Sequence, residues 1–123
     1  MDAIIAPKAR SDIANILAWT DENFGPRIMQ RYARLIKTAI QEIAANPELA
    51  GSVPRPEIAK NCRTYHLFFS RRQAGTRGDR IHKPRHLLLY RVGEAGVPEI
   101  GRVLHDSMEL DRHIPADYRE PAE

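Results

Sequence analysis

Histidine side chains are the only groups in this sequence that could carry acid–base chemistry at neutral pH without unusual tuning. The five histidines are His66, His82, His86, His105 and His113. One candidate site combines His105, as general acid or base, with three arginines that would stabilise a pentavalent phosphate: Arg63, Arg91 and Arg102. Such a site predicts a metal-independent ribonuclease-type reaction. The alternative is that these side chains only form hydrogen bonds and ion pairs at the sheet margin.

Motifs for other chemistries do not occur in the sequence. It contains no Walker loop, dinucleotide fingerprint, nucleophile elbow or helical zinc motif. Cys62 is the only cysteine, so neither an intramolecular disulfide nor a thiolate zinc site can form. We interpret Cys62 as a small, partly buried residue before a strand and not as a catalytic thiol. The sequence therefore predicts no metal and no cofactor.

A second candidate site is a local excess of positive charge. The net charge is only +3, yet the stretch from residue 71 to residue 85 contains one Asp, no Glu and six cations: Arg71, Arg72, Arg77, Arg80, Lys83 and Arg85. This cluster could attract phosphates or an acidic partner, or it could be a solvated loop. The outward basic face of the second predicted helix leaves the same choice open.

A strand near the C-terminus must position His105 and Arg102. We expect it at residues 97–104, overlapping a stretch 99–113 that begins as a strand and ends as a polar, basic turn. Because successive side chains of a strand point to opposite faces, residues 100, 102 and 104 are expected on one face and residues 101, 103 and 105 on the other. Two further strands are expected at residues 63–69, with alternating aromatic character, and at residues 86–92, a nearly continuous apolar run.

Two helices are expected before these strands. Pro7 opens the first, in which apolar residues recur every three or four positions until Gly25 and Pro26 end it. The second covers residues 26–45, and the short link predicts an antiparallel hairpin. Residues 47–61 are expected to be a loop. The predicted fold class is α+β, with a short N-terminal strand and the helix hairpin packed on one face of a mostly antiparallel sheet of about four strands.

The length of 123 residues predicts one domain. We expect it to cover residues 1–115, followed by a polar tail at residues 116–123 that frays. No apolar run approaches the roughly 18 residues of a membrane span, and the N-terminus lacks the basic and apolar regions of an export signal. We therefore expect a cytoplasmic protein without membrane contact.

Several segments, taken in order, resemble the ParE branch of the RelE/ParE toxins. They are Pro7 followed by residues 12–16, the Phe24-Gly25 link, Tyr32 and Ile36, Arg63-Thr64-Tyr65, Leu89-Tyr90-Arg91-Val92, and above all residues 100–110. The resemblance covers nearly the full chain. It implies a small toxin of a bacterial type II toxin–antitoxin operon that a ParD-like antitoxin neutralises in a hetero-oligomer. Any DNA contact would then be indirect or made through that complex.

The same resemblance leaves two activities open, because ParE-like members poison DNA gyrase whereas RelE-like members cleave messenger RNA on the ribosome. RelE-like ribonucleases have an arginine on the third strand and a tyrosine near the end of the last. Here the third strand reads Leu87-Leu88-Leu89, and Asp106 follows His105. The resemblance therefore favours gyrase poisoning, with an endoribonuclease or a nontoxic binding homologue as alternatives.

The resemblance gives four candidates for the toxic surface near the C-terminus: Arg102, His105, Met108 and Arg112. The segment 70–85 departs from the usual ParE pattern, because it is longer and more basic than a typical ParE strand connection. That segment could extend the sheet, contact DNA or form a mobile loop.

Overall fold

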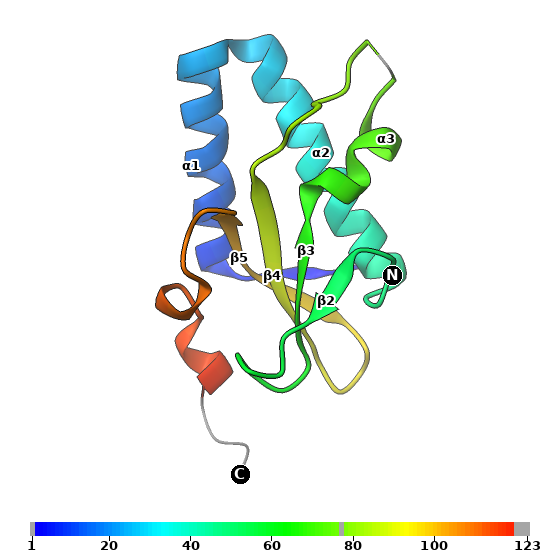
Figure 1. Ribbon diagram of the computed structural model, residues 1–123, viewed down its shortest axis with the longest axis vertical. Coiled ribbons are helices and arrows are strands. Elements are labelled where there is room, and N and C mark those ends of the chain that lie inside the picture. Colours follow the sequence, from blue (N-terminus) through cyan, green and yellow to red (C-terminus); the bar gives the residue numbers. More distant parts are fainter. Residues whose placement is uncertain (1, 77, 120–123) are drawn as a thin grey trace.

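A helix hairpin and a five-stranded sheet make up the computed structural model, which describes residues 2–76 and 78–119 (Figure 1). The elements are β1 (Ile4–Ile5), α1 (Pro7–Phe24), α2 (Pro26–Ala45), β2 (Ser52–Pro54), β3 (Cys62–His66), α3 (Arg71–Ala74), β4 (His86–Val92) and β5 (Pro98–His105). The strand order is β1-β5-β4-β3-β2, antiparallel throughout except for the parallel pair β1–β5. The predicted α+β class is confirmed.

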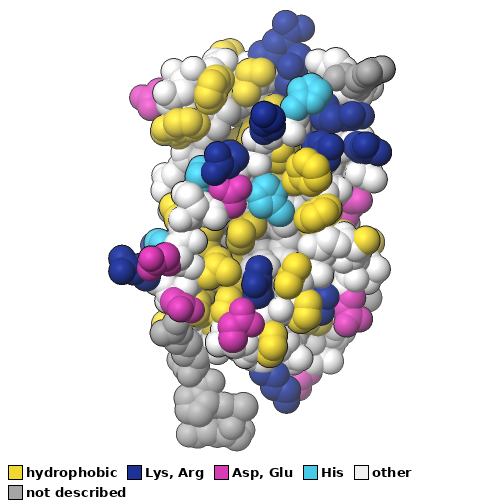
Figure 2. Space-filling view, viewed as in Figure 1, with side chains coloured by type: hydrophobic (Ala, Val, Ile, Leu, Met, Phe, Trp, Pro, Cys, Tyr) yellow, Lys and Arg dark blue, Asp and Glu magenta, His cyan; other side chains and the backbone are white. Residues whose placement is uncertain are grey.

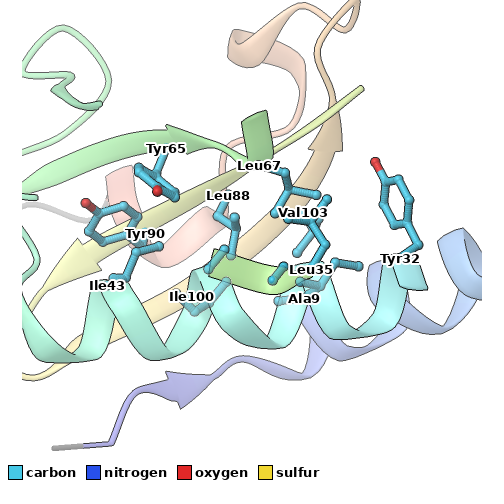
Figure 3. Close-up of a cluster of buried hydrophobic side chains, with 13 residues drawn as sticks. Ala9, Tyr32, Leu35, Ile43, Tyr65, Leu67, Leu88, Tyr90, Ile100 and Val103 are labelled. Carbon is cyan, nitrogen blue, oxygen red and sulfur yellow. The ribbon is translucent and has the colours of Figure 1, made fainter. Parts of the chain in front are cut away.

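Proline and glycine set the helix boundaries where the sequence predicts them. Both helices have a proline at their first position, where the missing N–H costs no hydrogen bond. Gly25 joins them with a φ of +89°, a conformation that favours glycine. The hairpin covers one face of the sheet (Figure 1). The long side chains that α2 buries against it lie in the cluster shown in Figure 3.

Two strand predictions differ from the structure. Residues 52–54, expected as loop, pair with β3 and raise the sheet to five strands. Strand β3 ends at His66, and residues 67–69, expected as strand, form a 3-10 turn instead. The turn begins there because the Phe68 N–H donates to Nδ1 of His66 and diverts the backbone from the ladder.

A bulge in β5 overturns the predicted division of its side chains between the two faces. Leu89 pairs with Arg102, but the next residue, Tyr90, pairs with Ile100, so Gly101 is the extra residue. The extra residue shifts the alternation by one position. Ile100 and Val103 therefore lie in the same core beneath the helices. His105 pairs with His86, two positions beyond Val103, and so shares that face.

The opposite face of the sheet carries a second, smaller core. Tyr118 packs there with Cys62 and Leu89, and the three side chains are 5%, 2% and 0% exposed. Residues 116–119 form a 3-10 turn, which contradicts the prediction that the tail frays from residue 116. The physical reason is the burial of the Tyr118 ring. Residues 120–123 lie outside the described residues. The searched residues include no helix that is long and apolar enough to cross a membrane.

Candidate functional site

Three histidines that are far apart in the sequence meet at one end of the sheet. His66 is the last residue of β3, His86 the first of β4 and His105 the last of β5. Because these strands are antiparallel neighbours, their register brings the three ends together: His86 pairs with His105, and His66 pairs with Leu87. The rings of His86 and His105 lie edge to face with centroids 5.3 Å apart.

Hydrogen bonds orient both rings near the groove. The Tyr32 hydroxyl accepts from the backbone N–H of Arg85 (3.3 Å) and shares a hydrogen bond with Nδ1 of His86 (2.6 Å). The Ser107 N–H donates to Nδ1 of His105 (3.1 Å). The His105 imidazole therefore holds its proton on Nε2 when neutral. Burial, with a smaller contribution from His105, lowers the pKa of His86 to about 4, and burial raises the pKa of Tyr32 to about 12.

Asp106 links the loop before β4 to the end of β3. Its carboxylate accepts two bonds from the Arg85 guanidinium, at 2.9 Å from Nη2 and 3.1 Å from Nε, and one at 3.0 Å from Nε2 of His66. The pKa of Asp106 lies well below its usual range, mainly because the carboxylate accepts hydrogen bonds from Arg85. Asp106 is therefore a charged anchor at neutral pH and not a proton donor.

An apolar groove of about 550 Å³ opens beside this cluster. Its lining comes from α1, the first turns of α2 and the loop before β4, together with His86 and His105. Trp19 and Phe24 are 56% and 60% exposed, and their rings meet edge to face at 5.8 Å. Figure 2 shows that cationic and histidine side chains gather in the upper half of the visible face, with hydrophobic side chains beside them.

The structure does not bring together the arginines of the predicted ribonuclease site. Arg63 pairs in register with Tyr90 and bonds Ser52 Oγ at 2.7 Å, and Arg91 bonds Asp117 at 3.1 Å. Both lie toward the end of the sheet opposite His105. His86 and Arg91 are five positions apart on β4, which corresponds to about 17 Å along a strand. This set is therefore not a single site.

The Arg102 guanidinium is also not free to bind a phosphate, because it has a structural role. It forms a two-pronged ion pair with Asp12 of α1, at 2.7 Å and 3.0 Å, and donates to the carbonyl of His113 at 3.2 Å. Both charged side chains are largely buried, with 15% and 13% exposure. Among the other predicted surface residues, Met108 is 44% exposed, and Arg112 is highly exposed while it pairs with Glu109.

The predicted basic segment divides into two parts. Arg71 and Arg72 belong to α3, where the Arg71 guanidinium lies 3.7 Å from the centroid of the Phe68 ring. Lys83 and Arg85 line the groove. Arg80 has a buried Nε that finds no hydrogen-bond partner among the described residues, and Arg77 lies outside them. The segment is therefore not one continuous cationic surface.

Sequence reasoning found His105 but missed the partners that define its setting. Tyr32 was named only among the residues that carry the resemblance, yet its hydroxyl reaches His86 (Figure 3 shows it at one end of the core). Asp106 was noted only as the residue after His105. Histidines at the ends of three successive strands are the signal that could have revealed the cluster. Within the described residues, no group of three or more His, Cys, Asp or Glu side chains could hold a metal ion.

Comparisons of the sequence with known proteins identify a family and relatives. A family model described as the ParE toxin of the type II toxin–antitoxin system parDE matches residues 3–110. The chain is also 27% identical over 111 residues to Toxin ParE1 of Mycobacterium tuberculosis, from strain CDC 1551 / Oshkosh and from strain ATCC 25618 / H37Rv. Each alignment covers 90% of this chain and 95% of the relative. The matched residues include both helices, all five strands and the groove.

Proposed function

This chain belongs to the ParE toxin family of type II toxin–antitoxin systems, and from that membership we propose that it arrests bacterial growth by poisoning DNA gyrase. We further propose that a ParD-like antitoxin neutralises it by forming a complex with it in the cytoplasm. The observation that carries the proposal is the family match across residues 3–110. According to this proposal, the toxin acts by binding its target and not by covalent chemistry of its own.

The separation of the candidate catalytic arginines supports binding over catalysis. Arg63 and Arg91 lie away from His105, and Arg102 is held by Asp12. The proposed toxic surface is the exposed region after β5, with His105, Met108 and Arg112. Arg102 contributes to it indirectly, because its bond to the His113 carbonyl positions the turn that carries Arg112.

A ribosome-dependent endoribonuclease is the second candidate function, and one observation favours it. The rings of His105 and His86 lie together, and Lys83 and Arg85 line the same groove. An imidazole next to cations could transfer a proton while the cations neutralise a phosphate. This candidate replaces the scattered arginines of the sequence-based hypothesis with residues near His105.

A paired assay distinguishes the two activities. The purified protein is tested for trapped gyrase cleavage complexes on supercoiled DNA and, in parallel, for cleavage of ribosome-bound messenger RNA. We expect trapped gyrase complexes and intact RNA, and we expect His105→Gln to leave the RNA result unchanged. Cut RNA that becomes intact with His105→Gln, together with unaffected gyrase, would establish the ribonuclease. Normal growth on expression, with neither activity, would establish the nontoxic homologue.

A further inference from the structure

A polar cleft of about 280 Å³ lies along α2. Its lining consists of Arg27, Gln30, Arg31 and Arg34 of the helix, together with Asp79. None of these residues lines the apolar groove. The three arginines are four and three positions apart, so a helix of about 3.6 residues per turn carries them on one side. We call these three residues the basic face of α2.

Only one of the three arginines is neutralised. The Asp79 carboxylate pairs with Arg31 at 3.2 Å. Arg27 and Arg34 are exposed, and neither has an acidic partner among the described residues. Glu42 is the only acidic residue of α2 and lies more than two turns beyond Arg34. Three guanidinium groups and one carboxylate therefore leave the cleft with an excess of two positive charges.

The place of the cleft on the helix adds to this positive charge. The cleft lies over the first turns of α2, the end at which the dipole of a helix is positive. The first turn contains no acidic residue, and no side chain caps it. Figure 2 shows Lys and Arg side chains gathered at the upper end of the molecule, where α2 begins (Figure 1). A bound anion would neutralise the arginines and the helix end together.

The length of this row of cations matches a chain of phosphates better than a single phosphate. A rise of about 1.5 Å per residue places Arg27 and Arg34 about 10 Å apart along α2, and Lys37 continues the row for about one turn. Duplex DNA carries a negative charge about every 1.7 Å along its axis, so several phosphates can face such a row. A guanidinium also binds phosphate oxygens through two parallel hydrogen bonds.

The composition of the cleft fits a duplex better than a peptide or a single strand. No apolar or aromatic side chain is among the described residues that line it. A protein partner would need buried aromatic or aliphatic anchors, and the bases of a single strand would need aromatic rings to stack on. The backbone of a duplex needs neither, because charged and polar side chains contact its phosphates and sugars.

We propose that the basic face of α2 binds the phosphate backbone of double-stranded DNA without reading its sequence. The choice of DNA over duplex RNA rests on the proposed action on gyrase, an enzyme that works on double-stranded DNA. Arg27 and Arg34 contact phosphates, while Arg31 is fixed by Asp79 and adds charge between them. This contact is direct, whereas the family resemblance implies only an indirect one.

The salt dependence of binding tests this contact. Fluorescence anisotropy of a labelled duplex of about 20 base pairs is followed as the full chain is added, at salt concentrations from about 50 to 200 mM. Three phosphate contacts predict a slope of about −3 for the logarithm of the binding constant against the logarithm of salt concentration. The double variant Arg27→Gln/Arg34→Gln should reduce the slope to about −1 and weaken binding about tenfold or more. Arg27→Lys/Arg34→Lys keeps both charges and should retain most of the slope.

The matched control is Lys8→Gln/Lys60→Gln, which removes the same number of positive charges at two exposed positions outside the cleft. Lys8 lies at the start of α1, and Lys60 lies in the loop between β2 and β3. This variant should change affinity by less than about twofold, because salt screens charges far from the contact. Equal losses in the two glutamine variants would overturn the inference, since net charge alone would then explain the binding.

The gyrase assay separates this inference from the proposed function. Trapped gyrase complexes with a wild-type chain that does not bind the duplex would overturn the DNA contact alone. Duplex binding that depends on the arginines, without trapped complexes, would overturn the gyrase proposal and support the DNA contact. Tighter binding to duplex RNA of the same sequence, or to poly-glutamate, would overturn the choice of DNA and assign the face to RNA or to an acidic protein.

Discussion

At the scale of single residues, Asp12 decides how Arg102 is used. Strand β1 pairs with β5 only at Glu99 and Ile100, so it leaves the Val103 N–H without a strand partner. The Asp12 carboxylate accepts that N–H at 3.0 Å and binds the Arg102 guanidinium at the same time. One side chain of α1 thus completes the edge of the sheet and neutralises a largely buried cation.

Asp12→Ala should therefore destabilise the protein strongly. It leaves a mostly buried guanidinium and a backbone N–H without their acceptor, so we expect the free energy of unfolding to fall by about 2–4 kcal/mol. Urea denaturation followed by circular dichroism measures the change. Glu109→Ala is the control because it breaks the exposed Arg112 pair, and it should cost less than about 0.5 kcal/mol. Equal costs for both variants would show that Asp12 has no such role.

His86 should make stability depend on pH in a defined window. Its pKa is about 4 in the folded protein, chiefly because of burial, and about 6.5 in an unfolded chain. Between these values the unfolded state binds more protons, so stability falls as pH drops from 6.5 toward 4. Allowing for partial solvent screening, we expect His86 to contribute about 1–2 kcal/mol to this loss.

Urea midpoints measured at pH 7.5 and 4.5 test this expectation. His86→Gln removes the titration while its amide can still hydrogen-bond to the Tyr32 hydroxyl, so the loss between the two pH values should shrink. His82→Gln alters an exposed histidine and should leave it unchanged. The groups around His86 are His105, Tyr32, Arg85, His66 and Asp106. The transition of Asp106, with a pKa below its usual range, lies mostly under this window. An unchanged loss in His86→Gln would show that His86 does not cause the pH dependence.

At the scale of elements, the bulge in β5 and the C-terminal segment depend on each other. A Cβ on Gly101 would overlap the Tyr118 hydroxyl and lie 2.9 Å from Cζ of that ring and 3.1 Å from Cγ of Pro115. The missing side chain is therefore what lets Tyr118 cover Leu89 and Cys62. The extra residue of the bulge and the packing of the tail form one structural unit.

Gly101→Ala should displace this segment and expose the only thiol. Cys62 is 2% exposed and burial raises its pKa to about 11, so it should react slowly with a disulfide reagent. We expect the labelling rate to rise about tenfold or more in Gly101→Ala, and similarly after deletion of residues 116–123. Gly93→Ala meets only an ordinary 3.6 Å contact and serves as the control. Slow labelling in all three variants would mean that Tyr118 does not protect Cys62.

The elements also show which features a sequence can and cannot predict. The helix bounds were predicted correctly because Pro7, Gly25, Pro26 and Pro47 act locally. Strand β2 was missed because Pro54 and its neighbours favour a loop, and only pairing with β3 makes them a strand. The bulge was missed because it depends on the contact of Gly101 with Tyr118. The candidate site was half predicted for the same reason: His105 is visible in the sequence, whereas its link to Tyr32 through His86 exists only after folding.

At the scale of the whole molecule, stability is concentrated in the centre of the sheet and falls toward the groove. Strand β4 lies between β3 and β5, and Leu88, Leu89 and Tyr90 are each 0% exposed. Residues 78–85 instead rest on the ion pairs of Asp79 and Arg85, and the Arg85 side chain is 59% exposed. Surfaces that bind partners are commonly drawn from such less stable regions.

Hydrogen exchange should therefore separate these two regions. We expect the amides of residues 88–90 to exchange only through global unfolding, and the amides of residues 78–83 and Arg85 to exchange at least about a thousandfold faster. Arg31→Ala removes one tether, the ion pair with Asp79, and should accelerate exchange in residues 78–83 further while β4 stays unchanged. Equal acceleration in β4 would instead indicate that Arg31 stabilises the whole fold and does not act as a local tether.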